Sequence, residues 1–191
     1  VVASLIMPSI IVSLGIGLMF RLVDTGVKAW LDANWPETGE AYTSTILGPD
    51  GAVYVFNNGG FRYVSQPGDC MRPVAQADDY SGGRIERVNL ATGIVERLYE
   101  QVDGIALKGP NDLVFGVDGG FWFTDLGKVR EREMDRGGVF HARPDGHSAR
   151  VVAHPVMTPN GTALSPDGHT LYVAETEGAR LWAYDVTGPG Q

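Results

Sequence analysis

Two segments of the chain repeat one pattern 49 residues apart. They are Pro110–Gly119 and Pro159–Gly168, and each runs from Pro-Asn through an apolar strand to an Asp-Gly turn, after which an aromatic-rich strand follows. A fixed period of about 40 to 50 residues with strand-turn-strand content is typical of the blades of a β-propeller. Because equivalent positions of successive blades face a common axis, Asn111 and Asn160 are expected to converge on one central channel.

Weaker copies of the pattern precede these two. Tyr42-Thr43 stands in the same register before the Asp50-Gly51 turn, and Pro8-Ser9 stands so before Gly17. No window keeps an apolar helical stripe for three turns, so the fold class is all-β. Propellers commonly close with about 4–8 blades, whereas this chain holds three to four. We therefore expect residues 1–191 to be a single partial propeller domain, a piece of a longer protein; a ring completed by a second chain is the alternative.

The first 44 residues match the repeat poorly. Residues 1–20 carry no charge and are rich in Val, Ile and Leu, so they are either buried strands of a first blade or a membrane anchor or signal segment. The interruptions at Pro8, Gly15 and Gly17 and the lack of basic residues favour the strands. The expected location is therefore the cytoplasm, without membrane attachment, and a membrane-tethered protein is the alternative.

Charge and cysteine content narrow the classes of partner. The net charge of −8 and the pI near 4.9 argue against nucleic acid, because phosphate binding needs a basic surface. Cys70 is the only cysteine, so no disulfide can form within the chain, and a buried structural thiol is expected. The sequence does not fix the oligomeric state.

Several further elements can be predicted. A hairpin is expected across 45–56, and outer hairpins across 84–99 and 137–154. Residues 65–83 are expected to form a long loop, because Gly, Pro and Asp are frequent there. The charged stretch 127–136 is either a solvated loop or a lid that brings basic groups over an anionic substrate.

The strongest chemical candidates are the two asparagines. Carboxamide oxygens are hard, neutral ligands suited to Ca²⁺ or Mg²⁺, although an Asn before a strand can also make a local turn to the backbone. Asp112, Asp125 and Glu175 are weaker candidates on or beside inner strands. The four histidines show no metal-type spacing and are expected at the surface, and no Gly-x-Ser-x-Gly nucleophile motif occurs.

From about Gly48 onward the chain resembles the SMP-30/gluconolactonase/luciferin-regenerating-enzyme family. The resemblance rests on separated motifs in the family's order: Gly109–Phe115, Gly119–Gly127, Pro159–Gly161, Leu164–Gly168 and Leu171–Thr176. It implies a six-bladed propeller with one divalent cation in its channel and hydrolysis of sugar-type lactones. Ca²⁺ is the first choice of cation, with Mg²⁺, Mn²⁺ and Zn²⁺ as alternatives.

The resemblance also implies site residues. Asn160 matches the family's metal-ligating Asn, and Asn111 matches the Asn beside the metal and the substrate. Ser9 stands in the register where the family has a ligating Glu, and Thr43 stands where relatives often have another Asn. The third ligand, an Asp, is expected beyond Gln191, so the catalytic residue is unknown from this sequence.

Two functions remain open at this point. The first is a divalent-metal-dependent lactonase that opens sugar or related lactones with metal-activated water. The second is a catalytically impaired propeller that binds a ligand or a partner, an alternative motivated by Ser9. The resemblance implies a small-molecule lactone as the partner of the first.

Overall fold

The computed structural model describes residues 42–67 and 70–191, which lie within one compact unit, Glu40–Gln191. The predictions that concern residues 1–41, among them Ser9, the first-blade strands and the possible anchor, lie outside the described residues, as do the side chains of Thr43 and Cys70. The described part of the chain is built from strands and contains no helix, as predicted. No helix that could cross a membrane is found in it.

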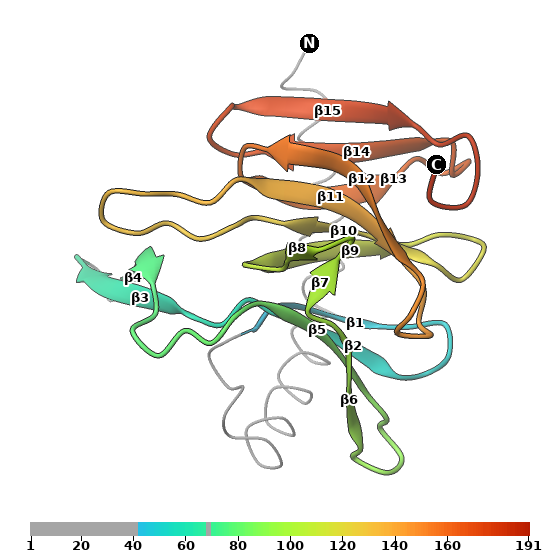
Figure 1. Ribbon diagram of the computed structural model, residues 1–191, viewed down its shortest axis with the longest axis horizontal. Coiled ribbons are helices and arrows are strands. Elements are labelled where there is room, and N and C mark those ends of the chain that lie inside the picture. Colours follow the sequence, from blue (N-terminus) through green and yellow to red (C-terminus); the bar gives the residue numbers. More distant parts are fainter. Residues whose placement is uncertain (1–41, 68–69) are drawn as a thin grey trace. The chain divides into compact units, whose positions relative to one another are not determined.

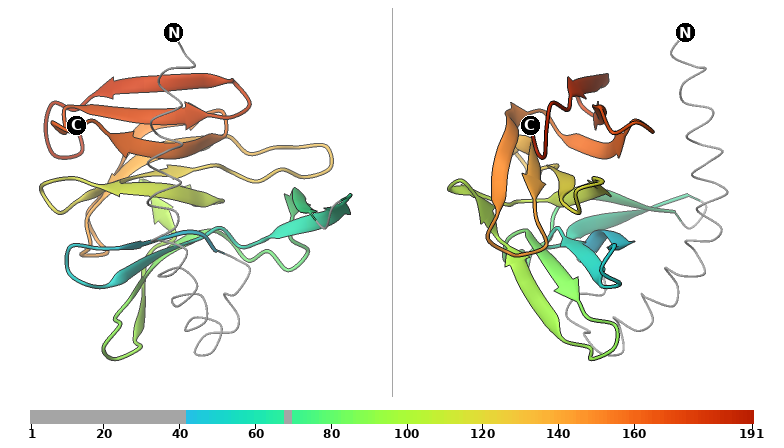
Figure 2. Two further views of the ribbon diagram at one scale, coloured as in Figure 1. Left: turned by 180° about the vertical axis from the view of Figure 1, so that it is seen from behind. Right: turned by 90° about the vertical axis from the view of Figure 1, so that its right-hand side faces the viewer.

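Three antiparallel sheets follow one another along the chain (Figures 1 and 2). The first has the order β1 (Tyr42–Leu47), β2 (Val53–Asn57), β5 (Arg84–Val88) and β6 (Val95–Tyr99). The second consists of β9 (Pro110–Phe115), β10 (Phe121–Asp125), β11 (Gly137–Ala142) and β12 (Ala149–Val156), and the third of β13 (Pro159–Leu164), β14 (Thr170–Glu175) and β15 (Arg180–Asp185). These are consecutive blades that do not close into a ring.

The first two strands of each sheet are joined by the repeated Asp-Gly turn. The glycines Gly51, Gly119 and Gly168 have φ angles of 75°, 77° and 73°, which a side chain disfavours. In each turn the Asp side chain accepts the N–H of the residue two positions on, at 3.0–3.2 Å. The sequence repeat is thus a repeat of one turn geometry, and it sets the same register in every sheet.

The blades pack through their alternating faces. Phe121 and Phe123 on β10 lie against Tyr54 and Phe56 of the first sheet, with ring centroids 5.7–6.2 Å apart. Trp122, which points to the opposite face of β10, packs with Leu171 and Val173 of the third sheet. Strand β10 is therefore buried on both faces, and its neighbours are fixed on either side.

Two short hairpins interrupt the meander. One joins β7 (Gln101–Val102) to β8 (Ile105–Ala106). The other pairs β3 (Phe61–Gln66) with β4 (Cys70–Gln76), where the sequence predicted a loop over 65–83. That prediction was wrong for residues 65–66 and 70–76, which pair as strands, with Pro73 inside β4 opposite Tyr63; residues 77–83 do form a loop.

Candidate functional site

The innermost strands β9 and β13 begin at the same end of the blades. The pairing of Pro110 with Asp125 and of Pro159 with Glu175 places the starts of these strands beside the ends of β10 and β14. Strands β9 and β13 pack against each other, as do β1 and β9. We call this the site end of the blades, because Asn111 and Asn160, the second residues of their strands, lie there.

Hydrogen bonds join β13, which carries Asn160, to β9, which carries Asn111, and to the neighbouring strand β10. Thr124 Oγ1 donates to the carbonyl of Asn160 at 2.5 Å, and the N–H of Thr162 donates to Asp112 Oδ2 at 2.9 Å. Asp112, one of the weaker site candidates, thereby acts as a tie between blades. These bonds fix the backbones of Asn111 and Asn160 relative to each other, while the sharing of one ion by their side chains stays a prediction.

The Asn160 side chain does not make the local backbone turn that was the alternative interpretation. Its Nδ2 donates to Thr176 Oγ1 at 3.2 Å, and Thr176 directly follows the neighbouring strand β14. Local turns of that kind occur instead at Asn57, Asn58 and Asn89, whose Oδ1 atoms accept nearby N–H groups. With its nitrogen held by Thr176, Asn160 can offer its carboxamide oxygen to a cation.

The carboxylate of Asp125 organises the loop that leads into Asn111. It is 3% exposed and accepts the N–H groups of Lys108, Gly109 and Gly127 at 2.7–2.8 Å. Burial raises the pKa of Asp125, and the three N–H donors act in the opposite direction. Since its oxygens are engaged with backbone groups two and three residues before Asn111, Asp125 shapes the site rather than facing a ligand.

Tyr80 braces the same loop from another side. Its hydroxyl donates to the carbonyl of Lys108 at 2.8 Å, and the N–H of Leu126 donates to the carbonyl of Gly109 at 2.8 Å. A side chain at Gly109 would collide with the carbonyl of Gly127. The segment before Pro110 is therefore held both by the loop 77–83 that precedes β5 and by the end of β10.

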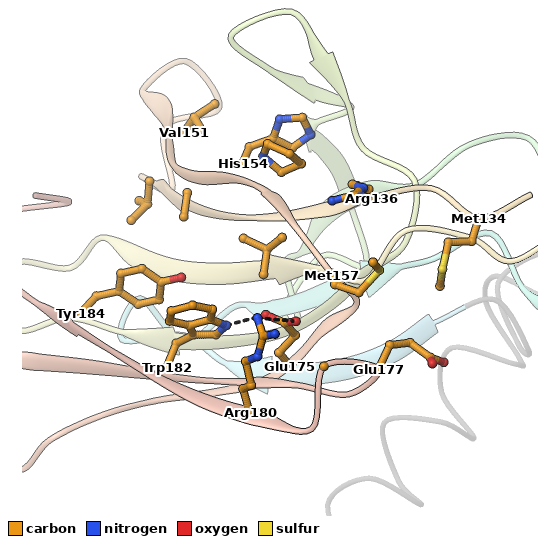
Figure 3. Close-up of a pocket in the computed structure, with 15 residues that line it drawn as sticks. Met134, Arg136, Val151, His154, Met157, Glu175, Glu177, Arg180, Trp182 and Tyr184 are labelled. Carbon is orange, nitrogen blue, oxygen red and sulfur yellow. Dashed lines mark hydrogen bonds and ion pairs between the residues drawn. The ribbon is translucent and has the colours of Figure 1, made fainter.

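Glu175 points into a separate pocket. Its carboxylate accepts the indole N–H of Trp182 at 2.5 Å and lies 3.8 Å from Arg180 (Figure 3). The pocket has a volume of about 840 Å³ and lies between β12 and the third sheet, with Met134, Arg136 and His154 among its lining residues. Glu175 is buried, and its carboxylate is engaged by Trp182 and Arg180 on the pocket side.

The stretch 127–136 is folded, and one of its basic residues is buried. Arg130 makes two bonds of 2.8–2.9 Å to Asp135, and Val129 bridges Met134. Lys128 is 1% exposed, and its ammonium donates to Asn58 Oδ1 at 3.2 Å and to the carbonyl of Gly60 at 2.8 Å. The interpretation as a wholly solvated loop was wrong at Lys128, because the carbonyl and amide oxygens at the end of β2 attract its ammonium inward.

Burial gives Lys128 a pH-dependent effect on stability. It lowers the pKa of Lys128 from 10.5 to about 8, although Asp125 and Asp135 act in the opposite direction, and Tyr80 is the other titratable neighbour. Between about pH 8 and 10 the unfolded chain holds this proton while the folded chain releases it, so stability rises with pH. We expect the free energy of unfolding of the wild type, relative to a Lys128→Met variant, to increase by about 1–2 kcal/mol from about pH 7.5 to 9.5.

Chemical denaturation of both proteins at a series of pH values checks this expectation. The range ends near pH 9.5 because the pKa values of Tyr54 and Tyr80 are raised to about 12, so ionising tyrosines destabilise the fold above about pH 10. If the difference in free energy of unfolding between the two proteins did not change across this pH range, the pKa of Lys128 would not be lowered by folding.

The prediction that all four histidines lie at the surface was wrong for His141. His147, His154 and His169 are exposed as predicted, but His141 is 6% exposed and packs edge-on against Trp122 with ring centroids 4.9 Å apart. Its Nε2 is buried without a hydrogen-bond partner among the described residues, and burial lowers the pKa of His141. A neutral ring suits this position, where His141 packs on Trp122, its partner across β10 and β11.

A divalent cation at the site end would need more oxygen ligands than Asn111 and Asn160 supply. Ca²⁺ takes about six to eight oxygen ligands, and carboxylates usually contribute. Within residues 42–67 and 70–191, no three His, Cys, Asp or Glu side chains gather as a metal site. The carboxamide oxygens of Asn160 and Asn111 suit such a cation. They supply only part of its ligand shell.

Comparison with known proteins gives a consistent result. Residues 28–191 match the model of the SMP-30/Gluconolactonase/LRE-like region. The chain is 30% identical over 167 residues to the gluconolactonase of Zymomonas mobilis, covering 80% of this chain and 46% of that protein. It is 39% identical over 80 residues to lactonase drp35 of Staphylococcus saprophyticus, covering 42% and 24% respectively. The chain thus spans less than half the length of these relatives.

A solved structure supports the fold. The chain superposes on a gluconolactonase from Xanthomonas campestris with a TM-score of 0.57 and 24% identity, covering 80% of this chain and 47% of that chain. At this identity the likeness bears on the architecture alone. The predicted incomplete propeller is confirmed by it and by the three unclosed sheets.

Proposed function

The chain belongs to the SMP-30/Gluconolactonase/LRE-like family, and from this membership we propose that the protein containing it is a lactonase, a hydrolase that opens sugar or related lactones. Relatives named gluconolactonase and lactonase support the reaction class. The observation that carries the proposal in this chain is the placement of Asn111 and Asn160 on adjacent innermost strands at one end of the blades. The whole protein's substrate and activity are part of the proposal.

We assign Asn160 as a ligand of one divalent cation and Asn111 as a substrate-binding residue. Ca²⁺ is preferred, since the Asn160 carboxamide oxygen is a hard donor, and Mg²⁺, Mn²⁺ or Zn²⁺ could take its place. When bound, such a cation supplies a Lewis acid for the lactone carbonyl and lowers the pKa of a bound water. Carboxylates from outside the described residues would complete the shell.

The chain's own groups prepare the site in two ways. The bond that Asn160 Nδ2 donates to Thr176 and the bond that Thr124 donates to the Asn160 carbonyl hold this residue in one orientation. The Asp125 carboxylate fixes the loop before Pro110, and we propose that from this position the Asn111 amide donates to an oxygen of the lactone. Preorganised donors of this kind lower a barrier because they need no rearrangement during the reaction. The general base stays unassigned, because Asp125 and Glu175 are both engaged.

A binding module without catalysis is the second candidate. The observation that favours it is the engagement of the three described acidic candidates, Asp112, Asp125 and Glu175, in structural contacts. In that case the same end of the blades would hold a ligand without turning it over.

Lactone hydrolysis by the complete gene product separates the two candidates. We expect opening of glucono-δ-lactone above the spontaneous rate, loss of this activity on chelation, and recovery when Ca²⁺ is returned, because the cation supplies the electrophile. Acid release followed in a pH-stat measures the rate. Turnover that survives chelation would contradict the metal assignment, and calorimetric lactone binding without turnover would favour the binding module.

A further inference from the structure

Two projections rise from the site end of the blades. The hairpin β3–β4 follows β2, and the 126–136 loop follows β10; both extend beyond the same end of the sheets, to the left in Figure 1. The N–H of Gln76, at the end of β4, donates to the carbonyl of Val129 at 2.9 Å. The two projections therefore touch each other, although one belongs to the first blade and the other to the second.

Lys128 makes the most deeply buried part of this connection. Its ammonium lies 3.8 Å from the centroid of the Phe61 ring and 5.4 Å from that of Tyr80, in addition to its bonds with Asn58 and Gly60. A desolvated ammonium over an aromatic face is strongly attracted to it. Lys128, from the second blade, thus contacts Gly60 just before the hairpin and Phe61 at its start. It also lies near Tyr80 in the loop that follows the hairpin.

The root of the hairpin is built for this close approach. Gly59 and Gly60 have φ angles of 73° and 84°, so the chain turns sharply between β2 and β3. A β-carbon at Gly59 would lie 2.5 Å from the Tyr80 ring. Tyr80 in turn donates to the carbonyl of Lys108, three residues before Asn111. The hairpin root, Lys128 and the loop before Asn111 form one continuous set of contacts.

We propose that Lys128 is a positioning residue of the candidate site: it fastens the β3–β4 hairpin to the 126–136 loop, so that the two form a fixed wall beside the entrance to Asn111 and Asn160. A lactone that approaches the asparagines from the site end passes this wall. This role of Lys128 in substrate access rests on the proposed function, since it assumes that a lactone binds at Asn111 and Asn160. The fastening itself does not depend on any activity and can be measured separately.

Hydrogen exchange of the hairpin tests the fastening. In the complete gene product at pH 7.5, Lys128→Met keeps the length and the apolar contact of the side chain and removes its charge and its N–H donors. We expect the amides of Phe61–Gln66 to exchange about tenfold faster than in the wild type, while β10 and β11 keep their protection. Arg132→Met is the matched control, because Arg132 is an exposed cation of the same loop, and it should exchange as the wild type does.

A second variant guards against misfolding. Phe61→Leu removes the aromatic face under the ammonium and keeps an apolar side chain, and it should accelerate exchange of β3 several-fold, by a smaller factor than Lys128→Met. Unchanged protection of β3 in both variants would overturn the proposal. So would an equal loss of protection in β3, β10 and β11, because Lys128 would then contribute only to global stability.

Steady-state kinetics test the wall. With a lactone substrate we expect Lys128→Met to raise KM several-fold and to leave kcat within about twofold, since a loosened wall affects capture of the substrate and not the chemical step. An unchanged KM together with accelerated exchange would overturn the wall and keep only the fastening. If the wild type hydrolyses no lactone, the proposed function fails, and the exchange results still decide whether Lys128 fastens the hairpin.

Discussion

Replacing Asn160 by alanine should lower kcat/KM for lactone hydrolysis by about 100-fold or more and weaken binding of the divalent cation at least tenfold. The reason is the position of Asn160: its nitrogen donates to Thr176, its carbonyl is held by Thr124, and its carboxamide oxygen can turn to the cation. Kinetics and isothermal calorimetry with Ca²⁺ on the complete gene product measure both effects.

Two variants control this experiment. Asn160→Asp keeps an oxygen donor of the same length, so it should retain cation binding. Asn89→Ala removes an asparagine that only accepts N–H groups of the β5–β6 turn, and it should leave both quantities unchanged. Normal cation affinity in Asn160→Ala would remove this residue from the ligand set.

Replacing Asp125 by alanine should lower the free energy of unfolding by about 4 kcal/mol, because three buried N–H groups lose a charged acceptor at once. Because the carboxylate fixes the loop before Pro110 and does not itself face the site, kcat/KM of the protein that remains folded should fall by about tenfold through misplacement of Asn111, less than the loss of a catalytic group would cause. Denaturant unfolding and active-site-normalised kinetics give the two numbers.

Asp125→Asn refines the prediction for this residue. The amide retains one acceptor oxygen for Gly109 and Gly127, but its NH₂ group would face the N–H of Lys108, so an intermediate loss of stability is expected. A large fall in kcat with unchanged stability would show instead that Asp125 acts on the substrate.

The repeat explains why the fold could be predicted from the sequence. The Asp-Gly turns at 50–51, 118–119 and 167–168 have one geometry, and the strands after them alternate between two faces, both of which are buried in β2 and β10. The residues of a turn, and the alternation of side chains along a strand, can be recognised from neighbouring positions in the sequence. Distant contacts are not needed for these predictions. The same logic predicted the outer hairpins from 84 and from 137.

Long-range contacts explain what the sequence did not show. Lys128 lies in a charged stretch, and only the arrival of Asn58, Gly60 and Phe61 from the first blade makes a buried position suitable for it. The β3–β4 hairpin was hidden because its flanking glycines and prolines are typical of loops. His141 was assigned to the surface because its burial depends on the side chain opposite it, and Trp122 is its partner across β10 and β11.

The candidate site was predicted only in part for the same reason. Asn111 and Asn160 were found because they occupy one register of the repeat, and the structure places their strands side by side. The roles of Asp112, Asp125 and Glu175 could not be distinguished by position, since the partners that engage them come from 16 to 50 residues away or from the next strand.

A crystal structure of the complete gene product soaked with Mn²⁺, with anomalous differences recorded, tests the central claim most directly. We predict one peak at the site end of the blades, within about 2.0–2.6 Å of Asn160 Oδ1, with the Asn111 carboxamide directed toward the same ion or its open face. A peak elsewhere, or carboxamides of Asn111 and Asn160 that point into separate regions, would contradict a shared site.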